Sequence, residues 1–309
     1  MKYTFGPVPS RRLGMSLGVD IVPFKTCSFD CVYCQLGATT DKSVQRQSFV
    51  PVKDVMDELR QVLDREGERI DFVTFSGSGE PTLNSDIGEM INQTKTFSNV
   101  PVAVLTNGSL LYREDVRKDL SRADLVVPSL DAITEQALSA VNRPHESLNA
   151  GMIVEGIKAF TQDFAGEIWL EIMIVKGVND DLADLKQTAD LVRGLKLNKI
   201  HLNTVARPPT EDFAQAVTAE EMSRVAGMFD SRVEIIADFS KHVAKELRTE
   251  DTENAILSLL KRRPCTVGDI SNSLGIHRNE VVKFVDHLTK DGSIKRVQHG
   301  DAWYYESTS

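Results

Sequence analysis

Three of the four cysteines in this chain lie within eight residues of one another. Cys27, Cys31 and Cys34 follow a C-x3-C-x2-C spacing. Three thiolates on one short loop can bind three irons of a 4Fe-4S cluster and leave the fourth iron without a protein ligand. An iron with an open coordination position is reactive, so the spacing predicts that this loop is the seat of catalysis.

Two other uses of clustered cysteines fit the sequence less well. A structural zinc ion takes four protein ligands, and the remaining cysteine, Cys265, lies far downstream in a segment that has the pattern of another domain. A disulfide needs an oxidising compartment, yet the amino terminus has no apolar signal segment and no run of about 18 apolar residues follows. We therefore expect a cytoplasmic protein with no membrane span, in which clustered cysteines indicate metal or redox chemistry.

The cysteine loop resembles the signature of a known family. Its C-x3-C-x-aromatic-C pattern, with Tyr33 before the last cysteine, is similar to that of the radical S-adenosylmethionine (radical SAM) superfamily. The stretches 6–14 and 16–20 resemble a branch that includes the wyosine-forming tRNA enzymes. The resemblance extends over about residues 5–245.

This resemblance implies two cofactors, a 4Fe-4S cluster and SAM. In the family, the open iron binds the amino and carboxylate groups of the methionine moiety of SAM. One electron, from a reductant such as flavodoxin or ferredoxin, cleaves SAM to methionine and a 5'-deoxyadenosyl radical that abstracts hydrogen from a substrate. The three clustered cysteines are accordingly the expected catalytic and metal-binding residues.

Polar residues at the ends of three consecutive predicted strands are expected to bind SAM. The run 78–80, Ser-Gly-Glu, resembles the family's Gly-Gly-Glu element, which contacts the methionine amino group, with serine in place of the first glycine. An ordinary turn with an exposed glutamate is the alternative. The next two strands end in side chains that suit ribose hydroxyls and a carboxylate. By resemblance, the SAM-binding rim consists of Tyr33, Ser78, Gly79, Glu80, Asn107, Ser129 and Asp131.

Apolar runs that alternate with amphipathic stretches predict an α/β fold. Strands are expected at 17–22, 70–75, 100–105, 125–127, 168–175, 200–205 and 233–236. Helical patterns lie between most of them, for example at 52–63, 87–96, 182–191 and 219–229. Such units form a parallel sheet covered by helices, here a partial (β/α)6-type TIM-like barrel with function at the carboxyl ends of its strands.

Strand parity places polar side chains on the inner face of this sheet. Glu171 shares a face with Met173, and His201 shares one with Asn203, while apolar residues alternate with them. A buried charge needs a partner or a function. Glu171 and His201 could pair with each other or contact a substrate, or one of them could face solvent.

Arginine and lysine residues near the strand ends suit anionic groups. Lys176 follows the fifth strand, where it either binds an anion or is solvated. Arg143 resembles a residue that the family has after its Ser-x-Asp strand. Arg11 and Arg12 precede the first strand and either clamp a phosphate or cap the barrel. The substrate candidates are Arg143, Glu171, Lys176, His201 and Asn203.

The pattern changes near residue 250, so we expect domains at 1–248 and 249–309. Helical stretches at 253–260, from 266 and at 278–288 precede a hairpin at 294–297 and 302–305, an order that resembles a winged helix. Residues 252–309 carry eight basic and seven acidic side chains, against a net charge of -9 for the whole chain. A local basic patch for RNA or protein could still form from Arg278, Lys283, Lys295, Arg296 and His299.

A second all-cysteine cluster is not possible because only Cys265 lies outside the loop. Wyosine formation by the family's two-cluster route is therefore not expected. The predicted function is a radical SAM enzyme, of oxidoreductase or transferase class, that modifies RNA, a protein or a metabolite. The alternative is a non-catalytic iron-sulfur sensor or regulator that acts through the winged helix. The oligomeric state is not predicted.

Overall fold

The computed structural model describes residues 2–10, 12–206, 209–236, 249–274, 276, 278–300 and 302–308, without the side chains of 249–251, 278–280 and 283. Its main sheet has the strand order β1-β2-β5-β6-β7-β8-β9-β11, parallel from β2 onward, with β1 antiparallel at one edge. These strands are β1 (Thr4–Ser10), β2 (Gly14–Val19), β5 (Phe72–Phe75), β6 (Val102–Thr106), β7 (Leu125–Pro128), β8 (Glu167–Lys176), β9 (Lys199–Thr204) and β11 (Val233–Ile235).

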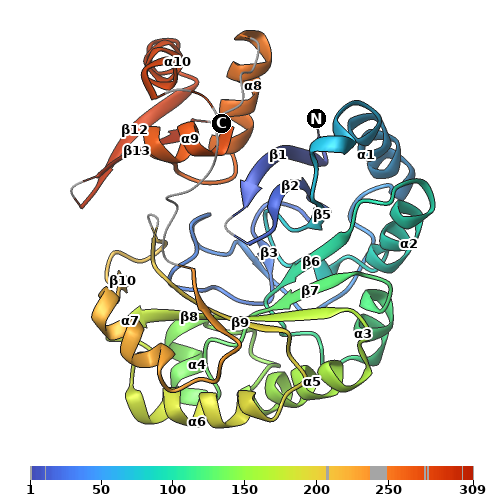
Figure 1. Ribbon diagram of the computed structural model, residues 1–309, viewed down its shortest axis with the longest axis vertical. Coiled ribbons are helices and arrows are strands. Elements are labelled where there is room, and N and C mark those ends of the chain that lie inside the picture. Colours follow the sequence, from blue (N-terminus) through green and yellow to red (C-terminus); the bar gives the residue numbers. More distant parts are fainter. Residues whose placement is uncertain are drawn as a thin grey trace.

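Helices follow most of these strands and lie around the outside of the sheet (Figure 1). They are α1 (Val52–Glu66), α2 (Ile87–Phe97), α3 (Glu114–Leu120), α4 (Glu135–Val141), α5 (Ala150–Asp163), α6 (Leu182–Arg193) and α7 (Ala219–Ala226), with short turns η1 (Gly67–Arg69) and η2 (Pro81–Leu83). Two-residue strands β3 (Thr26–Cys27) and β4 (Asp41–Lys42) pair with each other, and β10 (Gln215–Ala216) pairs with β8.

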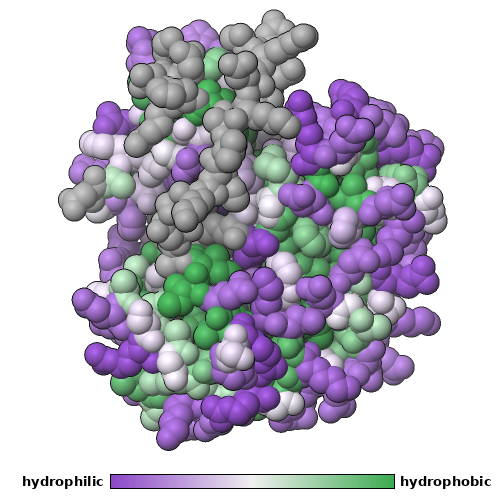
Figure 2. All heavy atoms as spheres, in the orientation of Figure 1, coloured by the Kyte–Doolittle hydropathy of each residue, from purple (hydrophilic) through white to green (hydrophobic). Residues whose placement is uncertain are grey.

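Alternate residues of each strand divide between the two faces of the sheet. Val73 and Phe75 of β5 and Ile172 of β8 are fully buried in one large cluster with helix residues such as Leu59. Their neighbours in sequence form the inner face, opposite the helices. Figure 2 shows hydrophilic side chains over much of the visible surface, with hydrophobic residues between them, as amphipathic helices require. The predicted α/β fold with a parallel sheet is confirmed.

The amino end of the inner face is filled by the β1–β2 hairpin. Leu13, in the hairpin turn, is 2% exposed and packs with Trp169, and the rest of this cluster comes from Ala103, Leu125 and Val127. Sequence patterns gave no indication of β1, because Pro7 and Pro9 interrupt it and proline is rare inside strands. β1 lies at the edge of the sheet, and an edge strand tolerates residues that cannot donate a hydrogen bond.

A second, smaller hydrophobic cluster belongs to the C-terminal unit. This unit contains α8 (Thr249–Leu260), α9 (Val267–Leu274), α10 (Arg278–Lys290) and an antiparallel pair, β12 (Ile294–His299) and β13 (Ala302–Ser307). The expected order of helices and hairpin is confirmed. Val8 of β1 packs against the cluster, so the unit lies beside the edge of the main sheet (Figure 1).

Two of the five predicted residues of the basic patch, Arg278 and Lys283, have no described side chain. Arg11, which is not part of this patch, lies outside the described residues altogether. On the hairpin, Lys295 pairs with Glu306 across the strands. Among the helices that the structure describes, none combines the length and apolar character of a membrane-spanning segment.

Candidate active site

The three clustered thiols lie on the loop that follows β2, and each has a nitrogen donor beside it. Nδ2 of Asn107, at the end of β6, is 3.5 Å from Sγ of Cys27. Nδ2 of Asn142, after α4, is 3.3 Å from Sγ of Cys31. The Lys25 ammonium group is 3.2 Å from Sγ of Cys34. Such N–H···S contacts are typical of groups that stabilise a metal-bound thiolate.

The chemistry of these thiols fits a cluster that carries positive iron. Burial raises the pKa of the Cys27 thiol to about 12, and burial also raises the pKa of Cys31 well above its usual value. A thiolate at either position therefore needs a cation as its partner. Within the described part of the chain, no three His, Cys, Asp or Glu side chains converge on a single metal ion. A cubane cluster needs no such convergence, because each cysteine binds a different iron.

The turn after β5 is fitted closely to the cysteine loop. The backbone N–H of Lys25 donates to the carbonyl of Ser78 at 2.7 Å, and the N–H of Glu80 donates to the carbonyl of Thr26 at 3.1 Å. A Cβ atom on Gly79 would lie 2.0 Å from that Thr26 oxygen. Only glycine fits at position 79, so the turn after β5 packs directly against the backbone of the cysteine loop.

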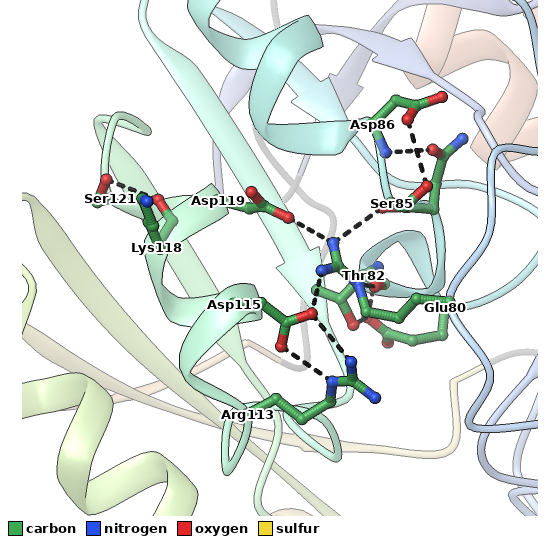
Figure 3. A network of polar contacts seen from close by, with 11 residues as sticks. Glu80, Thr82, Ser85, Asp86, Arg113, Asp115, Lys118, Asp119 and Ser121 are labelled. Carbon is green, nitrogen blue, oxygen red and sulfur yellow. Dashed lines mark hydrogen bonds and ion pairs between the residues drawn. The ribbon is translucent and has the colours of Figure 1, made fainter.

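Glu80 is buried beneath this turn, where its carboxylate accepts four hydrogen bonds. The donors are the backbone and hydroxyl of Thr82, the hydroxyl of Thr106 and the backbone of Asn107, at 2.6–3.0 Å. Burial raises the pKa of Glu80, and these hydrogen bonds oppose the rise. Figure 3 shows Glu80 beside Thr82. The alternative of an exposed glutamate is wrong, because Glu80 is only 2% exposed.

Arg46 connects the segment after the cysteine loop to α3. Its guanidinium group donates to the carbonyls of Thr82 and Asn84 at 2.9 and 3.2 Å. It also pairs with Asp115 and Asp119, both drawn in Figure 3, at 2.8 and 2.5 Å. The Arg46 side chain is 7% exposed. This network supports η2, which follows Glu80 directly.

Asp131 forms a second polar centre at the end of β7. Its carboxylate accepts hydrogen bonds from the hydroxyl of Tyr33, from Nδ2 of Asn142 and from the backbone of Met173. Burial raises the pKa of Asp131 to about 6, and the Tyr33 and Asn142 bonds act in the opposite direction. Ser129, two residues earlier, forms a bridge with Glu171 of β8. A hydrogen bond therefore joins Tyr33 of the cysteine loop to Asp131.

The inner-face candidates Glu171, His201 and Asn203 lie on neighbouring strands, below these strand ends. Glu171 pairs with Arg12 of the hairpin turn and accepts a hydrogen bond from Asn203 at 2.8 Å. His201 lies opposite Glu171 in the strand register. Its Nε2 is 3.5 Å from Oε2 of Glu234, and its buried Nδ1 has no hydrogen-bond partner among the described residues. Burial lowers the pKa of His201 to about 4, so the ring is neutral at pH 7.

The remaining two candidates lie further out. Arg143 pairs with Glu211 at 2.5 Å, and the backbone of Glu211 donates to Val32, so this pair lies next to the cysteine loop. Lys176 is exposed and pairs with Glu221 of α7 at 3.0 Å. The structure thus places Arg143 next to the cysteine loop and Lys176 apart from it at the surface.

Several residues of the site were not found from the sequence. Lys25, Arg46 and Asn142 act as donors from loops with no recognisable motif. Arg262 of the C-terminal unit also reaches the site, through an ion pair with Asp20. Proximity of Lys25 to the cysteines was the only signal available, since the other contacts span large separations in sequence.

The chain is similar to several known proteins. The sequence profile described as Radical SAM superfamily matches residues 21–192. A UPF0026 protein of Methanocaldococcus jannaschii is 32% identical over 311 residues, or 99% of this chain and 96% of that protein. A protein named GTPase Obg from Brachyspira hyodysenteriae is 35% identical over 95% of this chain, which spans only 43% of that protein. A solved radical SAM methyltransferase from Sphaerobacter thermophilus shares the fold, with a TM-score of 0.57 and 17% identity over 72% of this chain and 66% of that one.

The chain belongs to the radical SAM superfamily. A 4Fe-4S cluster and SAM are the cofactors of this family. Within the family, the similarity to the UPF0026 protein extends over nearly the whole of both chains.

Proposed function

We propose that this chain is a radical SAM enzyme whose cluster is bound by Cys27, Cys31 and Cys34. When bound, the cluster supplies an electron and SAM supplies the carbon radical that removes hydrogen from a substrate. One residue supports this proposal most directly. Asn107 donates from its side chain to Cys27 and from its backbone to Glu80, which joins the cysteine loop to the proposed SAM turn.

The proposed SAM rim extends from this turn across the ends of β6 and β7. The Ser78–Glu80 turn faces the cysteine loop, and Glu80 fixes its shape from below. Tyr33 and Asp131 hold the opposite side, with Ser129 between β7 and β8. The assigned role of these residues is to orient SAM against the open iron, with the curved sheet acting as a partial (β/α)6-type barrel.

The substrate is proposed to bind on the inner face below this rim. Glu171, His201 and Asn203 line that face, and Nδ1 of His201, which no described residue contacts by a hydrogen bond, is available as a hydrogen-bonding atom. Arg143 would border the entrance. Lys176, exposed and paired with Glu221, is the weakest of the five candidates. The likeness of residues 6–20 to the wyosine-forming branch keeps RNA among the proposed substrates.

We divide the chain into a catalytic domain, 1–248, and a winged-helix-like recognition domain, 249–309. The three helices and the hairpin support this assignment, as does their separate hydrophobic cluster. On the hairpin, the Arg296 guanidinium carbon lies 3.7 Å from the centroid of the Trp303 ring, which is 43% exposed. Filter binding of the whole protein to bulk tRNA tests the RNA role. Absence of binding that weakens with salt would exclude it.

The catalytic proposal is tested by anaerobic reconstitution, reduction and addition of SAM. We expect 5'-deoxyadenosine from the wild type and none from Cys27→Ala, Cys31→Ala or Cys34→Ala. Cys265→Ala is the matched control, because Cys265 lies in the hydrophobic cluster of the C-terminal unit. An intact cluster that yields no 5'-deoxyadenosine would instead favour the iron-sulfur sensor.

A further inference from the structure

Arg262 extends from the C-terminal unit into the catalytic part of the chain. It lies just after α8, and its guanidinium group pairs with the carboxylate of Asp20. The same nitrogen, Nη1, is 3.2 Å from the hydroxyl of Ser78. The guanidinium carbon also lies 4.3 Å from the centroid of the Phe5 ring. Two sides of Arg262 are thus in contact with the main sheet and its loops.

Asp20 follows β2, and its side chain is 7% exposed. Its Oδ2 atom accepts hydrogen bonds from the backbone and hydroxyl of Ser78, at 3.1 and 2.6 Å. Its Oδ1 atom is buried without a hydrogen-bond partner in the part of the chain that the structure describes. Gly77 passes so close that a Cβ there would lie 2.4 Å from Asp20. A buried carboxylate is costly unless it is paired or fully hydrogen-bonded, and Arg262 supplies an ion-pair partner from the C-terminal unit.

Ser78 connects this ion pair to the proposed SAM turn. Its hydroxyl contacts both Asp20 and Arg262, and its carbonyl accepts from Lys25 on the cysteine loop. The family pattern has glycine at this position, and glycine has no hydroxyl to make these contacts. The serine that departs from the pattern is therefore the residue that the C-terminal unit contacts.

We propose that Arg262 is a positioning residue for SAM. Docking of the C-terminal unit holds the Ser78–Glu80 turn through Asp20, so the affinity for SAM depends on a unit that does not itself form the SAM rim. This inference rests on the proposed function. It also implies that a partner that displaces Arg262 from Asp20 weakens SAM binding.

The test uses the full-length protein with its cluster reconstituted. SAM affinity is measured by equilibrium dialysis and by the change that SAM causes in the EPR spectrum of the reduced cluster. We expect Arg262→Met to raise the SAM Kd about tenfold, a typical coupling between sites, with iron content unchanged. Arg262→Lys, which keeps the charge, should fall between this variant and the wild type. Arg263→Met, the next residue along the chain, should match the wild type.

A double-mutant cycle separates positioning from a general loss of stability. In a Ser78→Gly background, the further effect of Arg262→Met on the SAM Kd should shrink, because the shared hydroxyl is gone. Wild-type affinity in Arg262→Met, or full additivity of the two changes, would overturn the inference. A wild-type protein that binds no SAM would instead overturn the proposed function. If Arg262→Met folds poorly, the SAM Kd of Arg262→Lys is compared with that of the wild type, with and without Ser78→Gly.

Discussion

Asn142 donates a hydrogen bond to the thiol of Cys31, although 111 residues separate them in sequence. The same Nδ2 atom lies 2.7 Å from Oδ2 of Asp131, so one amide serves both the cysteine loop and the opposite rim. Neighbours of this kind tune a metal centre through its ligands.

Asn142→Ala should shift the reduction potential of the reconstituted cluster to more negative values. An N–H···S bond stabilises the reduced state, in which sulfur carries more charge. SAM cleavage should fall about 10–100-fold. An EPR-monitored redox titration checks this, with the exposed Asn92→Ala as control. An unchanged potential would show that the bond has no role in tuning.

Gly79→Ala should separate the cysteine loop from the turn after β5. The added Cβ would meet the Thr26 carbonyl at 2.0 Å, which neither backbone can accommodate without moving. We expect a loss of about 1–3 kcal/mol in unfolding free energy and a lower iron content after reconstitution. Gly67→Ala is the control, because a Cβ there would meet no described atom within 4 Å and the φ of -54 at Gly67 suits alanine. Normal iron binding by Gly79→Ala would contradict the close fit.

Arg46→Met should destabilise the protein by about 2–3 kcal/mol, because the carbonyls of Thr82 and Asn84 lose their charged donor. Urea denaturation measures this. Arg113→Met provides a matched control: Arg113 also pairs with Asp115, at 2.9 Å, but its side chain is 36% exposed. Its loss should cost no more than about 1 kcal/mol. Equal costs for the two arginines would mean that burial of Arg46 contributes nothing.

The Arg12–Glu171 pair distinguishes a structural role from substrate contact. The two side chains are 17% and 14% exposed, so Glu171→Gln should leave Arg12 poorly compensated and cost about 2 kcal/mol. A double-mutant cycle with Arg12→Met should give a coupling of about 1–2 kcal/mol. If Glu171→Gln loses stability but keeps normal SAM and substrate affinity per folded molecule, Glu171 does not contact substrate.

Because of His201, the free energy of unfolding should decrease as the pH is lowered from about 6.5 to 4. Its pKa is about 4 in the folded chain against 6.5 for the free side chain, so the unfolded state takes up the proton first on acidification. Above pH 6.5 this residue contributes no pH dependence. Arg12, Lys199, Glu171 and Glu234 also act on its pKa.

His201→Gln removes this titration. Between pH 7 and 4.5 the wild type should lose about 2–3 kcal/mol more unfolding free energy than the variant does. Urea denaturation at both values measures the difference. Parallel losses in the two proteins would mean that His201 is protonated as readily in the folded chain as in the unfolded one.

Local patterns were sufficient to predict the parallel strands of the main sheet and the helices α1, α2, α6 and α7, but not β1. Alternation along β8 and β9 correctly separated Glu171 and His201 from Ile172 and Leu202, because a strand has a period of two. The cysteine spacing identified its loop because all three residues lie within one short segment.

The partners of these residues could not be predicted in the same way. The ion pair of Glu171 with Arg12 was not predicted, because a hairpin with no strand signal brings Arg12 there. Arg262 and Asp20 are 242 residues apart. Contacts of this kind depend on how elements pack, and a single sequence has no periodic pattern that records them.

Leu13 and its neighbours close the amino end of the inner face, while the cysteines lie beyond its carboxyl end. The apolar side chains around Leu13 therefore leave the carboxyl ends of the strands as the side from which a molecule on the inner face would reach the cysteine loop.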